Sequence, residues 1–119
     1  MKAVTTKKLT DLIVNALEDL KAFNIQTLDV TALTSITDVM IIASGRSNRQ
    51  VKALADQVQE KIREAGLPLL GMEGDSEAEW ILIDAGDVVL HIMQPATRDY
   101  YQLEKLWKTE DAINTSKKV

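Results

Sequence analysis

A continuous apolar segment followed by a glycine turn limits the possible folds more than any other feature. Asp38–Ala43 has no polar residue after Asp38, which is typical of a strand buried on both faces of a sheet. Gly45 provides a turn, and apolar residues then recur from Val51 to Ala65 at the spacing of an amphipathic helix. This unit favours a sheet that carries packed helices.

The N-terminal part of the chain predicts one helix and one short strand before that segment. Apolar residues over 9–20 follow the three-four spacing of an amphipathic helix. Thr5 or Thr6 is a suitable N-cap, and Asn24 lies near the expected end of the helix. Residues 27–30 have the composition of a short strand.

The C-terminal half predicts three strands, two of which form a hairpin. Gly66 ends the second helix, and Leu69–Leu70 is the expected third strand. Trp80–Asp84 and Val88–Met93 carry strong strand signals, and Ala85–Asp87 between them is a tight turn. The hairpin makes at least one strand pair antiparallel, so we expect a mixed sheet.

A last helix and the chain length complete the predicted fold. Pro95 ends the last strand, and Thr97 can cap a helix that reaches Trp107. The polar residues 109–119 are expected to fray. A chain of 119 residues is one domain by length. We predict a single α/β (α+β) domain, 1–119, with a mixed sheet of about five strands flanked by helices, in the order αββαβββα.

The charge distribution indicates the kind of partner. The formal net charge is −4, and no Lys or Arg occurs between Arg63 and Arg98. That window contains seven acids: Glu64, Glu73, Asp75, Glu77, Glu79, Asp84 and Asp87. A surface built from these residues would repel phosphate backbones and attract a basic partner. A solvated acidic loop explains the same composition.

Composition excludes several kinds of site and segment. The sequence has no cysteine, hence no disulfide and no thiolate metal site, which suits a reducing cytosol. The N-terminus lacks the apolar segment of a signal peptide, and no apolar run approaches the ~20 residues that cross a membrane. We therefore expect a cytoplasmic protein without a membrane partner.

The turn Gly45–Gln50 has two interpretations, a nucleotide site or a helix start. It lacks the Gly-x-x-x-x-Gly-Lys-Ser/Thr pattern of a P-loop and the three glycines of a dinucleotide fingerprint. Ser47 and Gln50 have the spacing of a capping box, in which the Ser47 hydroxyl accepts from the Gln50 N–H and the Gln50 side chain accepts from the Ser47 N–H. Capping is the favoured interpretation, although such a helix start can still attract an anion.

The titratable residues give no convincing catalytic or metal set. Asp84 and Asp87 lie on either side of the hairpin turn and need not converge on a cation. Asp38 is at the end of its strand that lies away from the Gly45 turn, where a nucleotide site would be. His91 is the only histidine, and a lone histidine in an apolar strand is usually a hydrogen-bonded structural residue. We predict no catalytic residue and no metal ligand.

Four of the five aromatic residues lie in the last third of the chain: Trp80, Tyr100, Tyr101 and Trp107. They flank the acidic window. They can fill a core, or they can anchor an interface, where Trp and Tyr are common. An acidic, aromatic surface is suited to binding a basic protein and poorly suited to binding RNA.

Three blocks of the sequence resemble the ribosomal silencing factor family, also called the Iojap family. They are DVMIIASGRSNRQVKALAD, MEGDSEAEWILIDAGDVVLHIM and RDYYQLEKLW, within a resemblance that runs from about Leu9 to Trp107. It implies a nucleotidyltransferase-like fold without the catalytic carboxylates, no enzymatic activity and no cofactor. It also implies binding to the large ribosomal subunit through its fourteenth large-subunit protein. Binding there blocks joining of the small subunit and lowers translation under nutrient limitation.

On this resemblance, seven residues are expected to contact the partner: Trp80, Asp84, Asp87, His91, Met93, Tyr100 and Tyr101. The sequence departs from the family pattern at Val39, Met40 and Met93, where aromatic residues are common. The alternatives are a nucleotidyltransferase-like nucleotide-binding enzyme and a dimeric adaptor. We expect no direct sequence-specific nucleic acid binding, and a homodimer is compatible with the sequence.

Overall fold

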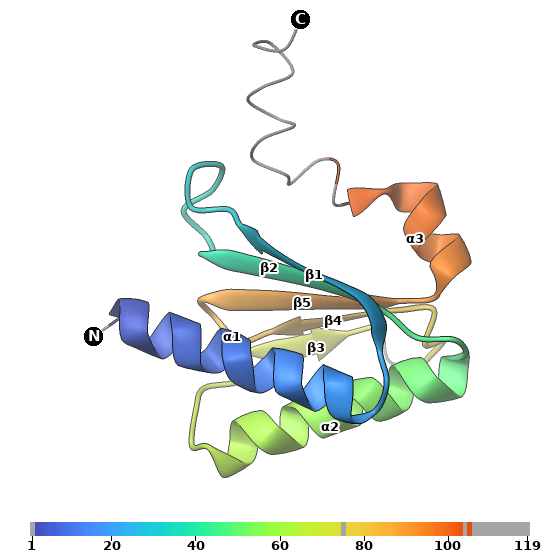
Figure 1. Ribbon diagram of the computed structural model, residues 1–119, viewed down its shortest axis with the longest axis horizontal. Helices are drawn as coiled ribbons and strands as arrows, with labels where there is room; N and C mark the ends of the chain where they lie inside the picture. The colour runs from blue at the N-terminus through green and yellow to red at the C-terminus, as the bar shows by residue number, and fades with distance from the viewer. Residues whose placement is uncertain (1, 75, 104, 106–119) are drawn as a thin grey trace, which may run out of the picture.

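Five strands form one mixed sheet in the order β1-β2-β5-β4-β3, and two long helices lie on one of its faces (Figure 1). The computed structural model describes residues 2–74, 76–103 and 105. The elements are α1 Lys2–Asp19, β1 Phe23–Asp29, β2 Val39–Ser44, α2 Asn48–Glu64, β3 Gly71–Glu73, β4 Trp80–Asp84, β5 Val88–Met93 and α3 Pro95–Tyr101. Their order confirms the predicted αββαβββα arrangement.

β5 is the middle strand of the sheet and pairs with two neighbours in opposite senses. It runs antiparallel to β4, as the predicted hairpin requires, and parallel to β2. Gly86 adopts the positive φ of +85° in the hairpin turn, and its N–H donates to Asp84 Oδ1 at 2.9 Å. The parallel pairing explains why α2 must follow β2, since the chain has to cross over the sheet to return in the same direction.

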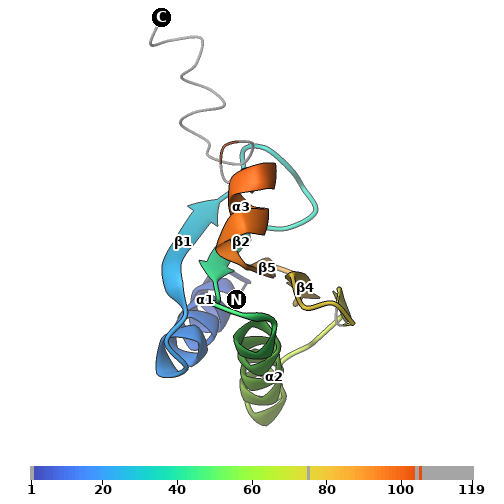
Figure 2. The ribbon, with the colours of Figure 1, turned by 90° about the vertical axis from the view of Figure 1, so that its right-hand side faces the viewer.

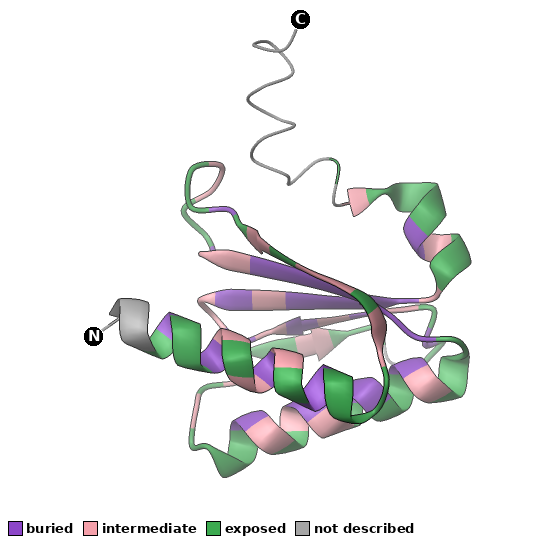
Figure 3. Cartoon of the chain, viewed as in Figure 1, coloured by how far each residue is buried: buried purple, intermediate pink, exposed green. Residues whose placement is uncertain are grey.

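Alternation along the strands divides their side chains between two unequal faces. Ile81, Ile83, Leu90 and Ile92 are buried toward α1 and α2, where the main hydrophobic core lies. Figure 2 shows both helices on this side of the sheet, and Figure 3 shows their buried residues facing it. The opposite face carries only α3 near one end, so much of it is free of helices (Figure 1).

The apolar segment that predicted a doubly buried strand is confirmed. Every residue of β2 from Met40 to Ser44 is buried. Ile41 and Ala43 belong to the core under the helices, whereas Met40 and Ile42 form a smaller cluster with Val30 and Met93 on the other face. Both faces of β2 are therefore covered, which is why its apolar run is continuous rather than alternating.

The capping box at the start of α2 is confirmed in one half and wrong in the other. Ser47 Oγ accepts from the Gln50 N–H at 3.1 Å, as predicted. Gln50 Oε1 accepts from the N–H of Arg46, at 2.5 Å, and not from that of Ser47. Gln50 Nε2 also donates to the carbonyl of Leu20 at 3.1 Å, so this side chain joins α2 to the end of α1.

The predicted N-cap of the first helix is wrong. Thr5 and Thr6 lie inside α1, which begins at Lys2. Thr6 is buried, and its hydroxyl donates to Asp87 Oδ2 at 3.3 Å, which explains a threonine within a helix better than capping does. The helix ends at Asp19, earlier than expected, and Asn24 belongs to β1.

The remaining differences concern element boundaries. The third strand is Gly71–Glu73 and not Leu69–Leu70. The last helix has Gln94 as its N-cap and Pro95 in its first turn, so Thr97 lies inside it. It ends at Tyr101, where Gln102 takes a left-handed conformation. Apart from residues 102, 103 and 105, the predicted extension to Trp107 lies outside the described residues, and so does the tail 109–119.

None of the helices in the described part of the chain is both long and apolar enough to span a membrane.

Candidate functional site

The sheet face opposite α1 and α2 brings together four of the seven predicted partner-binding residues. Trp80 and Asp84 alternate with buried residues of β4, and His91 and Met93 do the same on β5. Trp80 pairs directly with Met93, and Leu82 pairs with His91, so these side chains are neighbours on one face. Two adjacent strands therefore place these side chains on one face, where Trp80 and Asp84 are half-buried and His91 and Met93 are buried.

Aromatic rings gather at the end of this face where β4 begins and α3 follows β5. The ring of Trp80 lies 4.8 Å from that of Tyr101 and 5.8 Å from that of His91, measured between centroids. Tyr100 meets Tyr101 edge to face at 4.9 Å. Tyr100 is 81% exposed and Tyr101 is 49% exposed, so these two rings face solvent. We name Trp80, His91, Tyr100 and Tyr101 the aromatic cluster.

His91 is the buried member of the aromatic cluster. Its side chain is 6% exposed, and its Nδ1 accepts from Trp80 Nε1–H at 2.9 Å. Burial lowers the pKa of His91 from the ordinary 6.5 to about 4. The imidazole is therefore neutral at pH 7, and because Nδ1 accepts, its proton is on Nε2. This geometry suits a role in which His91 positions the Trp80 ring better than a role in acid–base chemistry.

Two cavities flank Trp80 and are bordered by acidic residues. One, of about 280 Å³, is lined by Gly74, Ser76, Glu77, Glu79, Trp80, Thr97 and Tyr101. The other, of about 270 Å³, is lined by Glu73, Gly74, Trp80 and Leu82. The three glutamates are exposed and form no ion pair within the described residues. Each cavity thus has an aromatic or apolar wall and a carboxylate rim.

Gly74 shapes the wall that the two cavities share. Its φ is +90°, and a Cβ at this position would lie 2.0 Å from the carbonyl oxygen of Trp80. Only glycine allows the backbone to approach β4 so closely. The sequence reasoning gave Gly74 no role beyond the family resemblance, because a single glycine carries no signal of what it packs against.

The two predicted aspartates lie at the other end of β4, away from the aromatic cluster. Asp84 is four residues from Trp80, roughly 13 Å along the strand, and it accepts from the turn N–H of Gly86. Asp87 accepts from the hydroxyl of Thr6, on the face covered by α1. The structure therefore separates these carboxylates from the rings.

Met93 is placed beside Trp80 but has no exposed surface. It packs with Met40 and Ile42, two residues that are also buried. A partner would reach Met93 only if the residues that cover it moved. Its position supports Trp80 from below, which is a packing role.

Arg98 is a residue that the sequence reasoning missed. It lies on α3 and is only 7% exposed, and its Nη1 donates to the carbonyl of Asn24 at 2.6 Å and to Ser44 Oγ at 2.8 Å. These bonds hold α3, and with it Tyr101, against the ends of β1 and β2. An arginine on a short polar helix reads as exposed in the sequence, so no local signal indicated this role.

The Gly45 turn is closely packed and its polar groups are used locally. A Cβ on Gly45 would lie 2.9 Å from Val51 Cγ2, and the Gly45 N–H donates to the carbonyl of Met93 at 3.0 Å. Ser47 caps α2. Within the described residues, no group of three or more His, Cys, Asp or Glu side chains could hold a metal ion.

Comparison with known proteins gives a consistent assignment. The family described as "Ribosomal silencing factor during starvation" matches residues 3–119. A ribosomal silencing factor of Chromobacterium violaceum is 54% identical over 101 residues, covering 85% of this chain and 83% of that protein. One of Bacillus subtilis is 38% identical over 101 residues, covering 85% of this chain and 86% of the other.

Solved structures agree with the sequence comparison. A crystal structure of a Chromobacterium violaceum protein superposes with a TM-score of 0.84 at 53% identity, covering 85% of this chain and 84% of the other. One from Bacillus halodurans gives a TM-score of 0.78 at 38% identity, covering 86% and 95%. The family resemblance and the α+β fold inferred from the sequence are confirmed. The chain belongs to the ribosomal silencing factor family.

Proposed function

We propose that this protein binds the large ribosomal subunit through its fourteenth large-subunit protein and prevents the small subunit from joining. Translation would then fall when nutrients are limiting. The proposal places the protein in the cytoplasm, where subunits join. It contains no chemical step, so we assign no catalytic residue and no cofactor.

The observation that carries the proposal is the pairing of the aromatic cluster with a carboxylate rim. Trp80 and Tyr101 form one wall of the 280 Å³ cavity, and Glu77 and Glu79 line the same cavity without an ion pair among the described residues. A lysine or arginine can lay its aliphatic stem on an aromatic ring and direct its charge to a carboxylate. Ribosomal proteins are rich in such side chains.

The exposed rings fit the usual anatomy of a protein interface. Tyr100 and Tyr101 offer large rigid surfaces with few rotamers to immobilise, and Trp80 is supported from below by His91 and Met93. Charged residues on the rim steer a basic partner and contribute to its orientation. We therefore place the centre of the interface at Trp80 and Tyr101, and the acids at its edge.

Asp84 and Asp87 have a peripheral place in this proposal. They lie at the opposite end of β4 from Trp80, so one compact contact centred on the rings does not include both ends. Asp84 shares the sheet face of Trp80 and can meet a partner that extends along β4. Asp87 faces Thr6 of α1, which makes it the least favourable of the seven predicted contacts.

Inhibition in this proposal is steric. A protein of this size that occupies a surface of the large subunit excludes the small subunit from the same surface, and no conformational change is needed. The strength of inhibition then follows from affinity and concentration alone.

Co-sedimentation with separated ribosomal subunits tests the proposal. We expect the protein to pellet with the large subunit and not with the small one, and to reduce the fraction of joined ribosomes when both are mixed. A folded protein that pellets with neither subunit would overturn the proposal. A rise in melting temperature with ATP or CTP and Mg²⁺ would instead favour the nucleotide-binding alternative.

A further inference from the structure

A surface of opposite charge lies close to the aromatic cluster. Lys21 follows the end of α1, Arg46 precedes α2, and Arg49 lies in the first turn of α2. All three side chains are exposed. We name these three residues the basic patch. They come from segments that are far apart in the sequence, so the sequence alone does not place them together.

Contacts of Gln50 and Phe23 bring the basic patch together. Gln50 Nε2 donates to the carbonyls of Leu20 and Lys21, at 3.1 and 3.3 Å, which places Lys21 beside the start of α2. The Arg46 guanidinium carbon lies 5.3 Å from the centroid of the Phe23 ring. Arg49 is three residues after Arg46, in the first turn of α2.

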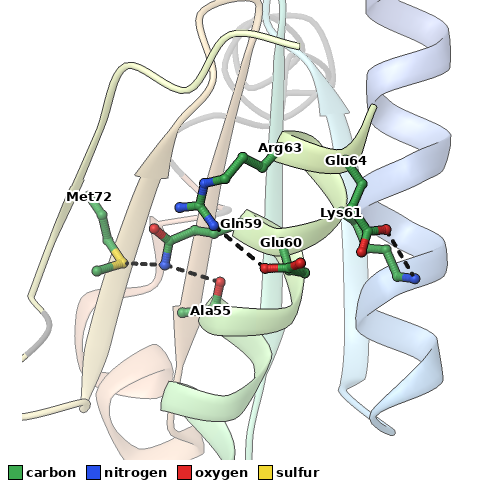
Figure 4. A network of polar contacts seen from close by, with 7 residues as sticks. All are labelled: Ala55, Gln59, Glu60, Lys61, Arg63, Glu64 and Met72. Carbon is green, nitrogen blue, oxygen red and sulfur yellow. Dashed lines mark hydrogen bonds and ion pairs between the residues drawn. The ribbon is translucent and has the colours of Figure 1, made fainter. Parts of the chain in front are cut away.

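The cations of the basic patch are available to an anion. Within the described residues, Lys21, Arg46 and Arg49 form no ion pair, whereas Lys61 and Arg63 at the other end of α2 do (Figure 4). No Asp or Glu occurs between Asp38 and Asp56, and the first turn of α2 contains no acid. Glu18 and Asp19 border the patch on α1 and limit its extent on that side.

The basic patch and the aromatic cluster lie at the same end of the molecule. The Gln94 amide donates to Asn48 Oδ1, in the first turn of α2, and to the carbonyl of Ala78, two residues before Trp80. Figure 2 looks at this end, with α3 above the start of α2. A single large object that covers the rings would therefore also come close to the arginines.

We propose that the basic patch contacts the phosphate backbone of ribosomal RNA next to the protein that the aromatic cluster binds. This inference rests on the proposed function and adds a second class of contact to it. Arginine guanidinium groups match phosphate oxygens and carry no base specificity, so the contact is independent of sequence. The acidic rim repels phosphates, and the basic patch attracts them, which together determine the orientation of the bound protein.

The test compares two double variants in binding to purified large subunits at several salt concentrations. Arg46→Gln with Arg49→Gln removes two charges of the patch. Lys61→Gln with Arg63→Gln removes two charges from the far end of the same helix (Figure 4). Net charge is thus matched, and melting curves establish that both variants are folded.

Counterion release predicts a specific result. Loss of two phosphate contacts should weaken binding about tenfold at low salt and flatten the slope of log Kd against log salt by about one to two. The control variant should keep the wild-type affinity and slope. Isolated fourteenth large-subunit protein should bind the patch variant as tightly as it binds the wild type.

Each other outcome contradicts a defined part of the proposal. A patch variant with wild-type affinity and slope would overturn the RNA contact and leave the proposed function intact. A patch variant that also binds the isolated fourteenth large-subunit protein more weakly than the wild type does would show that the patch contacts protein. That result would overturn the RNA contact as well. Wild-type protein that does not bind the large subunit would overturn the proposed function, and this inference with it.

Discussion

Trp80 and His91 depend on each other for their orientation. The indole N–H donates to His91 Nδ1, and that bond keeps the neutral imidazole in one tautomer while it fixes the rotamer of the ring above it. Met93, fully buried, supports the indole from β5. A solvent-facing anchor is thus attached to a buried hydrogen-bond acceptor, and two predictions follow at the scale of single residues.

Replacement of Trp80 by alanine should weaken binding to the large subunit by roughly 2 kcal/mol or more, since the variant loses the ring at the proposed centre of the interface. Trp80→Phe, which keeps a ring but not the N–H, should lose less. Affinity from sedimentation, together with a melting curve for each variant, provides the measurement. A folded Trp80→Ala protein with wild-type affinity would mean that the interface lies elsewhere.

The second prediction concerns pH. The unfolded chain binds a proton at His91 as pH falls below about 6.5, whereas burial lowers the folded pKa of His91 to about 4. The unfolded state therefore holds more protons in this window, and stability must fall as pH drops from 6.5 toward 4. The loss from this residue is about 3 kcal/mol, complete below the folded pKa.

Urea unfolding between pH 7 and pH 4 measures this loss when the wild type is compared with His91→Gln. The glutamine carbonyl can accept from Trp80 Nε1–H but does not titrate, so the variant should lose less stability on acidification. Carboxylates contribute equally to both proteins and cancel in the difference. Parallel curves for the two proteins would contradict the assignment of His91 as the titrating group.

At the scale of elements, α3 depends on one buried side chain. The helix has only seven residues, too few to be stable alone, and it has no side-chain cap. Arg98 attaches it to the carbonyl of Asn24 and to Ser44 Oγ, at the ends of β1 and β2. The position of Tyr101 in the aromatic cluster therefore depends on a residue that itself has almost no exposed surface.

Arg98→Met should lower the free energy of unfolding by about 2 kcal/mol, because the two acceptors lose a charged donor in a buried place. It should also weaken binding to the large subunit, since Tyr101 is no longer held beside Trp80. Asp99→Asn is the matched control, as Asp99 is the exposed neighbour on the same helix. Equal urea midpoints for Arg98→Met and the wild type would show that α3 is held by other contacts.

At the scale of the whole molecule, the two faces of the sheet differ in what covers them. α1 and α2 bury one face in the main core, and the other carries α3, the aromatic cluster and the half-buried residues of β4. Acids border the rings and cations gather at the start of α2, so opposite charges adjoin at one end despite a net charge of only −4. Local placement, and not total charge, decides what this surface attracts.

Glu77→Gln with Glu79→Gln should weaken binding to the isolated fourteenth large-subunit protein by about tenfold at low salt, and less as salt screens the pair. Glu60→Gln with Glu64→Gln removes the same charge from the far end of α2 and should leave binding unchanged (Figure 4). Similar losses in both variants would mean that overall charge, and not the cavity beside Trp80, attracts the partner.

Local patterns in the sequence determined much of this architecture. The order of elements, the hairpin around Gly86, the doubly buried β2 and the Ser47 cap all follow from short-range rules of periodicity, turn chemistry and capping. The family also followed from three blocks of sequence. Two of the boundaries that the sequence reasoning missed, at Thr6 and Thr97, are positions where a threonine lies inside a helix.

Tertiary structure alone decided where the side chains of distant segments meet. The parallel pairing of β2 with β5 places Ser44 near Arg98, and the hairpin register places His91 beneath Trp80. The tertiary structure also places Asp87 beside Thr6 of α1, away from the rings. These are contacts between residues up to 81 positions apart, and periodicity in a sequence reports which face a residue occupies but not what lies opposite to it.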